Sequence, residues 1–284
     1  MNQGERNIME KQVAVLIDGD NISAKYAQSI KQEALQYGNI KVFRLYGSVN
    51  SPNTKRWYPV MPRQGIMPVL QISYASGKSI ADQALTIDAM DLLHSDSIDI
   101  FCIASSDSDF TKLVYRLKES GKIVIGMGES KTKEALAKAC DEFKILNLIY
   151  QTEDDTVRSN GNYEEEIKDH NRYDEKILEN SLYDNEILDD DEEEEIEEVE
   201  ISIPELSEIS SYIASYIETL DSERVNLATL GNVLKKRFSG FDARNYKFSN
   251  MTQMMKKIDG FKVESENAPD GVHKVIYISL ADRH

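Results

Sequence analysis

The sequence has few of the residues that build disulfide-bonded or metal-thiolate proteins, and it has no long hydrophobic run. Its 2 cysteines, Cys102 and Cys140, share no metal-ligand spacing with the 4 histidines, so we expect both to be reduced thiols in a core. No apolar stretch approaches the ~20 residues of a membrane span. The opening MNQGERNIMEKQ also lacks the apolar segment of a secretory signal. These absences predict a cytoplasmic protein that does not contact a membrane.

Positive charge is in deficit, but only in one part of the chain. The net charge is −17, and residues 151–200 hold 22 acidic and 4 basic side chains, a balance of −18. The remaining residues hold 28 acidic and 29 basic side chains, a balance of +1, so the overall acidity does not exclude a nucleic-acid partner. A like-charge run with so few core-forming residues is typical of a disordered, self-repelling linker. We therefore predict a domain at 1–150, a disordered acidic linker at 151–203 and a second domain at 204–284.

Apolar runs alternate with helical patterns throughout the first domain. The expected strands are 13–17, 41–47, 69–74, 98–105, 122–128 and 143–148, and the expected helices lie near 23–37, 79–94, 109–120 and 131–140. Residues 55–64 read as irregular. Continuous apolar strands that alternate with helices predict an α/β fold, with a parallel sheet covered on both faces.

Carboxylates follow two of these strands directly. Asp18 and Asp20 come after the first strand, and Asp107 and Asp109 after the fourth. Acidic residues at such positions often cap the next helix. Parallel sheets, however, bind their ligands at the carboxyl ends of the strands, so the four side chains share one rim if the two strands are neighbours. Asp82, in the first turn of the helix after strand 69–74, is expected at the same rim.

Repulsion between these carboxylates favours a bound cation. Two unit charges about 4 Å apart repel by roughly 4 kcal/mol at an effective dielectric constant near 20. Hard oxygen ligands without nearby Cys or His favour Mg²⁺ or Mn²⁺. Such an ion can activate water and neutralise charge on a phosphate. The cluster therefore predicts metal-assisted hydrolysis of phosphodiester bonds.

Three stretches, LIDGDNIS, GKSIADQALTIDAMDL and IASSDSDFTKLVYRLKESGKIVIGMG, resemble the NYN domains of the PIN-like nuclease superfamily over about 13–148. The resemblance implies a metal-dependent endoribonuclease on an α/β sheet. Ser106 departs from the glycine that many relatives have before the first aspartate of the third stretch. The catalytic positions that the resemblance implies are Asp18, Asn21, Asp82, Asp107 and Asp109, and the metal ligands among them are Asp18, Asp82, Asp107 and Asp109.

Two alternatives remain open at this point. The chain could be a non-catalytic RNA-binding adaptor that retained the acidic site. VLIDGDNI also fits loosely the start of a haloacid-dehalogenase-type phosphatase, with Asp18 as nucleophile and Asp20 as acid/base. That alternative would recruit Lys78 and Ser105, and it leaves Asp82 without a role.

The second domain has a winged-helix pattern. Pro204 opens a helix over 205–220, and further helices at 227–238 and 249–258 precede strands at 261–265 and 273–280. The stretch LATLGNVLKKRFSGFDARNYKFSNMTQMMKKIDGFKVE resembles the LOTUS domain, also called OST-HTH, which implies binding of RNA, here single-stranded, or docking to an RNA-processing protein.

Basic residues of the second domain could form one RNA-binding face, with Tyr246 or Phe248 available for stacking. The competing interpretation is an ordinary solvated helix surface. The predicted RNA-binding residues are Lys235, Lys236, Arg237, Arg244, Lys247, Lys256 and Lys257.

Overall fold

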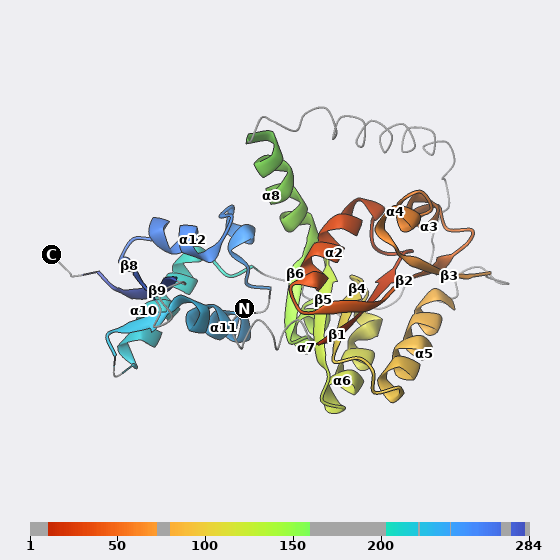
Figure 1. The fold of residues 1–284 in the computed structure, drawn as a ribbon, viewed down its shortest axis with the longest axis horizontal. Helices are drawn as coiled ribbons and strands as arrows, with labels where there is room; N and C mark the ends of the chain where they lie inside the picture. The colour runs from red at the N-terminus through yellow and green to blue at the C-terminus, as the bar shows by residue number, and fades with distance from the viewer. Residues whose placement is uncertain are drawn as a thin grey trace, which may run out of the picture.

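The chain folds into two parts, which a computed structural model describes for residues 11–72, 80–159, 203–220, 222–238, 240–267 and 274–281 (Figure 1). The N-terminal part is a parallel α/β domain, and the C-terminal part is a small α+β domain with an antiparallel sheet. Most of the predicted acidic linker, residues 160–202, lies outside the described residues. Within the described ranges, no helix combines the length and apolarity that a membrane crossing requires.

A six-stranded sheet forms the centre of the N-terminal domain, in the order β3-β2-β1-β4-β5-β6. Every neighbouring pair is parallel, as the alternating sequence pattern predicted. The strands are β1 Gln12–Asp18, β2 Asn39–Ser48, β3 Met67–Gln71, β4 Ile100–Ala104, β5 Ile123–Gly128 and β6 Glu142–Ile145.

Helices cover both faces of this sheet, because consecutive residues of a strand point to opposite faces. In β1, Ala14 and Leu16 pack on the face covered by α5, α6 and α7, while Val13, Val15 and Ile17 pack on the face covered by α2, α3 and α4. The helical elements are the 3₁₀ turns η1 Ala24–Tyr26 and η2 Ser108–Phe110, and the helices α2 Ala27–Leu35, α3 Pro52–Trp57, α4 Val60–Gln64, α5 Ile80–His94, α6 Thr111–Glu119, α7 Glu134–Ala139 and α8 Leu146–Ser159.

In the N-terminal domain, the structure differs from the sequence-based expectation in two segments. Residues 55–64, expected to be irregular, lie in α3 and α4, where Ser51 accepts the N–H of Thr54 and Pro52 occupies the first turn. The last expected strand, 143–148, ends at Ile145, and α8 then continues to Ser159 inside the segment expected to be linker. Leu146 and Ile149 are buried at helical spacing, which explains why a helix forms there.

The C-terminal domain packs helices against a three-stranded antiparallel sheet of order β7-β9-β8. Ile209, Ile213 and Ile217 line the buried side of α10, and Met254 and Met255 fill the same core. The predicted helices and the two final strands are present, and β7 adds a strand that was not predicted. The elements are α10 Leu206–Glu218, β7 Arg224–Asn226, α11 Leu227–Arg237, η3 Ala243–Tyr246, α12 Met251–Lys257, β8 Phe261–Asn267 and β9 Lys274–Leu280.

Candidate active site at the carboxyl end of the parallel sheet

The first and third motifs lie side by side at one rim of the sheet. Strands β1 and β4 pair directly, with Ile17 opposite Ala104, so the loops after them are neighbours. The Asn21 side chain joins these loops, because its Oδ1 accepts the N–H of Ser106 at 2.8 Å. Strands β1 and β4 are therefore neighbours, which is the condition for a shared rim.

Asp18 is the most enclosed carboxylate of the rim, with 2% of its surface exposed. Its Oδ2 accepts the Ser105 hydroxyl at 2.8 Å, and its Oδ1 accepts the N–H of Asn21 at 3.2 Å. Burial, together with the negative charges of Asp82 and Asp20, raises the pKa of Asp18 to about 7, against the effect of these two hydrogen bonds. The proximity of Asp82 that this repulsion requires agrees with its predicted place at the rim.

Asp20 binds the neighbouring strand and helix. Its Oδ1 accepts the Thr54 hydroxyl at 2.6 Å, and its Oδ2 accepts the N–H of Ser48 at 3.0 Å. The carboxylate therefore ties the first motif to the end of β2 and to α3.

Helix α3 also holds the backbone of the first motif. The Asn53 amide donates to the carbonyls of Gly19, Asp20 and Ile22 at 3.0–3.1 Å, and the Trp57 indole donates to Ile22 at 2.9 Å. A Cβ atom at Gly19 would lie 2.8 Å from the Leu45 side chain, so only glycine fits this close passage. Helix α3, whose last three residues fall in the segment expected to be irregular, thus holds the backbone that follows Asp18.

Asp107 and Asp109 belong to the turn that follows β4. The side chain of Asp107 caps η2 by accepting the N–H of Asp109 at 2.9 Å, and the N–H of Asp107 itself binds Ser105 Oγ at 3.0 Å. The capping role considered for these residues is therefore present at Asp107. Asp109 is exposed in the same turn.

The predicted carboxylates do not converge on a single point. Within the described ranges, no group of three or more His, Cys, Asp or Glu side chains is arranged to hold a metal ion. Asp18 and Asp82 nevertheless repel each other, and Mg²⁺ commonly takes one or two carboxylates and completes its shell with water and substrate phosphates. A cation bound at this rim would relieve the repulsion between Asp18 and Asp82.

Two further side chains of the rim were not assigned to a nuclease site from the sequence. Ser105 was considered only for the phosphatase alternative, yet it binds Asp18 directly. Glu129 follows β5, and its N–H binds Ser106 Oγ at 3.0 Å while its carboxylate accepts the Tyr26 hydroxyl at 3.0 Å. An acidic residue directly after an apolar strand was the signal that could have found Glu129. Lys78, the other residue of the phosphatase alternative, lies outside the described residues.

The seven basic residues of the predicted RNA-binding face have different surroundings. Lys235 and Arg244 are paired with carboxylates of the N-terminal domain. Tyr246 and Phe248, offered for stacking, pack against the core of the C-terminal domain. The exposed members of the set are Lys236, Arg237, Lys247, Lys256 and Lys257.

The parallel sheet carries acidic side chains at one rim, and a small α+β domain follows it in the chain. This is the two-domain arrangement that the sequence motifs predicted. Family models match an NYN domain over residues 12–147 and an OST-HTH/LOTUS domain over residues 204–273. The chain therefore has an NYN domain followed by an OST-HTH/LOTUS domain. This assignment agrees with the resemblances in the sequence and gives no support to the phosphatase alternative.

Individual proteins also resemble part of this chain. An uncharacterized protein of Methanocaldococcus jannaschii is 27% identical over 123 residues, which cover 42% of this chain and 48% of that protein. The match thus spans about half of the length of that relative. A crystal structure of a protein of unknown function from Vibrio parahaemolyticus is 20% identical, with a TM-score of 0.39, over 48% of this chain and 92% of the other.

Proposed function

We propose that the NYN domain is a metal-dependent endoribonuclease and that the OST-HTH/LOTUS domain recruits its single-stranded RNA. The observation that carries the proposal is the buried Asp18, whose pKa is raised to about 7 beside Asp82 at the carboxyl end of β1. Burial and neighbouring carboxylates disfavour the ionised form of Asp18, and a bound divalent cation would offset this effect.

Asp18 and Asp82 would hold Mg²⁺ or Mn²⁺, with Asp107 and Asp109 contributing through water or through substrate phosphate oxygens. The ion, when bound, supplies an activated water and neutralises charge on the phosphate. Ser105 keeps the Asp18 carboxylate oriented through its hydrogen bond. Asn21 ties the loops after β1 and β4 together, and it would orient a ligand or the RNA strand at their junction.

Exposed basic residues of the OST-HTH/LOTUS domain would supply contacts to RNA phosphates. Lys256 and Lys257 end α12, and Lys236 and Arg237 end α11, all with exposed side chains. Lysine and arginine contacts of this kind give affinity that falls as salt rises. We include Lys247, exposed after η3, in the same proposed face.

The competing function is a non-catalytic RNA-binding adaptor. It is favoured by the finding that the described acidic side chains form no group of three or more at the rim. Cleavage of end-labelled single-stranded RNA with and without Mn²⁺, by wild type and by Asp18→Asn purified in parallel, tests the two functions. Mn²⁺-dependent cleavage that is lost in Asp18→Asn supports the nuclease, and RNA binding without cleavage supports the adaptor.

A further inference from the structure

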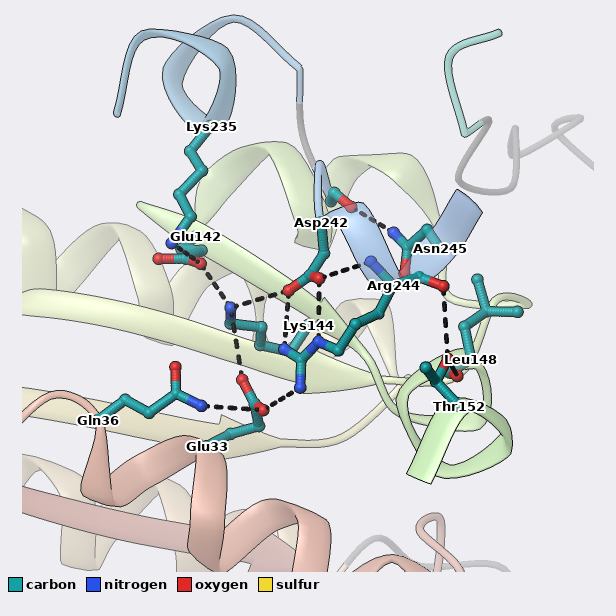
Figure 2. Close-up of polar contacts among 11 residues, drawn as sticks. Glu33, Gln36, Glu142, Lys144, Leu148, Thr152, Lys235, Asp242, Arg244 and Asn245 are labelled. Atoms are coloured by element: carbon teal, nitrogen blue, oxygen red, sulfur yellow. Dashed lines mark hydrogen bonds and ion pairs between the residues drawn. The ribbon is translucent and has the colours of Figure 1, made fainter. Parts of the chain in front are cut away.

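The OST-HTH/LOTUS domain contacts the NYN domain through buried charges at the edge of the parallel sheet (Figure 2). The Arg244 guanidinium donates to Glu33 of α2 at 2.6 Å, and it also donates to Asp242 in its own domain at 2.7 and 2.9 Å. Oδ2 of Asp242 lies 3.4 Å from Nζ of Lys144 in β6. Each of these side chains therefore faces an opposite charge on the other domain.

The same network extends along β6. Nζ of Lys144 lies 2.7 Å from Glu142 and 3.4 Å from Glu33. Lys235, at the end of α11, reaches across to Glu142 at 2.8 Å. Figure 2 shows these side chains converging from α2, β6, α11 and the segment that begins η3. We call Glu33, Glu142, Lys144, Lys235, Asp242 and Arg244 the docking network.

The charges of the docking network cancel only when the two domains meet. The NYN domain contributes two carboxylates and one ammonium group, a balance of −1. The OST-HTH/LOTUS domain contributes two cations and one carboxylate, a balance of +1. The side chains of Glu33 and Lys144 are only 1% and 3% exposed, and buried charge is costly unless it is paired. Each domain thus supplies the counter-charge that the other lacks.

The ionisation of the network agrees with this balance. Burial acts to raise the pKa of Asp242, but the hydrogen bonds from Arg244 and the charges of Lys144 and Arg244 hold it well below its usual range. Burial acts to lower the pKa of Lys144, but the charges of Glu142, Asp242 and Glu33 raise it overall. The docked arrangement therefore favours the charged forms.

Contacts outside the network support the same arrangement. The hydroxyl of Thr152 in α8 donates to the carbonyl of Arg244 at 3.4 Å, and Ile203 packs against the core of the NYN domain. A cleft of about 330 Å³ lies beside the network, lined by residues of both domains that include Phe143 and Phe241.

We propose that the OST-HTH/LOTUS domain docks on the NYN domain of its own chain through the docking network, so that the two domains form one body. Lys235 and Arg244 then serve domain docking, and the exposed basic residues of the C-terminal domain remain for RNA. This inference does not depend on nuclease activity, because it concerns only how the domains are held.

The test is a distance measurement in the full chain, without RNA or metal. Nitroxide labels at Lys112→Cys in α6 and Ser215→Cys in α10 report the separation of the domains by double electron–electron resonance. Both positions are exposed, whereas the native cysteines are buried. Docking gives one narrow distance distribution. Arg244→Glu places a carboxylate against Glu33 and should replace the narrow component by a broad one.

Two further variants separate loss of docking from loss of folding. Glu33→Gln removes a charge from the NYN side at nearly constant shape, so it should also weaken the narrow component while leaving the fold of the other domain untouched. Lys274→Glu makes the same charge reversal as Arg244→Glu at an exposed position outside the network, and it should leave the distribution narrow.

Three outcomes would overturn the proposal. The first is a broad distribution in the wild-type chain. The second is a narrow distribution that neither Arg244→Glu nor Glu33→Gln changes. The third is a narrow distance distribution in a mixture of two proteins, one labelled only at Lys112→Cys and the other only at Ser215→Cys. That result would mean that the NYN domain of one chain is docked to the OST-HTH/LOTUS domain of a second copy.

Discussion

The hydroxyl of Ser105 donates a hydrogen bond to Oδ2 of Asp18 at 2.8 Å, within the rim that joins β1 and β4. Oγ of Ser105 also accepts the N–H of Asp107 at 3.0 Å, so one small side chain connects the first and third motifs. Burial raises the pKa of Asp18, and the bond from Ser105 lowers it. Ser105 therefore favours the ionised carboxylate that a cation would need.

Ser105→Ala should lower the affinity for Mn²⁺ by about 10–100-fold, the usual effect of losing a partner that orients a metal ligand. Isothermal titration calorimetry with MnCl₂ measures this change directly, with cleavage as a second readout. Ser108→Ala is the matched control, because Ser108 lies in the same turn and its hydroxyl is not bonded to Asp18. Equal Mn²⁺ affinity in wild type and Ser105→Ala would show that this hydrogen bond does not support the metal site.

The metal-free protein should lose stability through Asp18 as the pH rises from about 4 to about 7. The folded-state pKa of about 7 lies above the ordinary aspartate pKa of 3.8, so folding favours the protonated form. The penalty for ionising Asp18 is absent below the pKa of the unfolded state and is complete above the pKa of the folded state. Each pH unit between these two pKa values adds about 1.4 kcal/mol to the penalty. Asp18→Asn should therefore be more stable than wild type at pH 8 in EDTA and close to it at pH 4. Melting temperatures across this pH range measure the difference, and parallel curves for the two proteins would refute the raised pKa.

Asp107→Asn should abolish Mn²⁺-dependent cleavage and keep the fold. An asparagine oxygen can still accept the N–H of Asp109, so the cap of η2 survives while the charge is removed. Asp107→Ala loses both the cap and the charge, and it should also melt at a lower temperature. Cleavage by Asp107→Asn at the wild-type rate would show that this carboxylate has no part in the reaction.

Asn53→Ala should destabilise the NYN domain by about 1–3 kcal/mol, because it leaves three carbonyls of the first motif without the amide that binds them. The midpoint of urea unfolding measures this change. Asn50→Ala, an exposed asparagine just before α3, serves as the control. Unfolding midpoints that agree within error for the two variants would mean that water replaces the lost contacts.

RNA binding should depend on salt through the exposed lysines of α12. Each phosphate contact to single-stranded nucleic acid contributes a slope of about −0.7 to the plot of log K against log salt. The double change Lys256→Ala and Lys257→Ala should make the slope shallower by about 1.4, by the same rule. Lys274→Ala should leave the slope as in wild type. Fluorescence anisotropy with labelled single-stranded RNA at several salt concentrations provides the values, and an unchanged slope in the double variant would place the RNA elsewhere.

Periodicity and residue order were sufficient to predict the parallel sheet and the approximate place of most helices. Strands such as β1 and β4 are continuous apolar runs because both of their faces are covered, and that pattern is visible without coordinates. The acidic motifs at their carboxyl ends could be found for the same reason. The short helix α3 and the helical end of the NYN domain, α8, were missed. Their formation depends on tertiary contacts, such as those of Trp57 with Ile22 and of Tyr150 with Tyr26.

The long-range partners of the charged side chains were decided by the tertiary structure alone. In the sequence, Asp18 and Asp20 look equivalent, yet one is buried beside Ser105 and the other binds Thr54 at the end of β2. Arg244 looked like a residue for RNA, yet it lies against Glu33, which is 211 positions away in the chain. Local sequence determines propensity and pattern, whereas burial and pairing of charge depend on which distant segments the fold brings into contact. That is why the motifs could be predicted from the sequence, and why the orientation of Asp20 and the contact between the two domains could not.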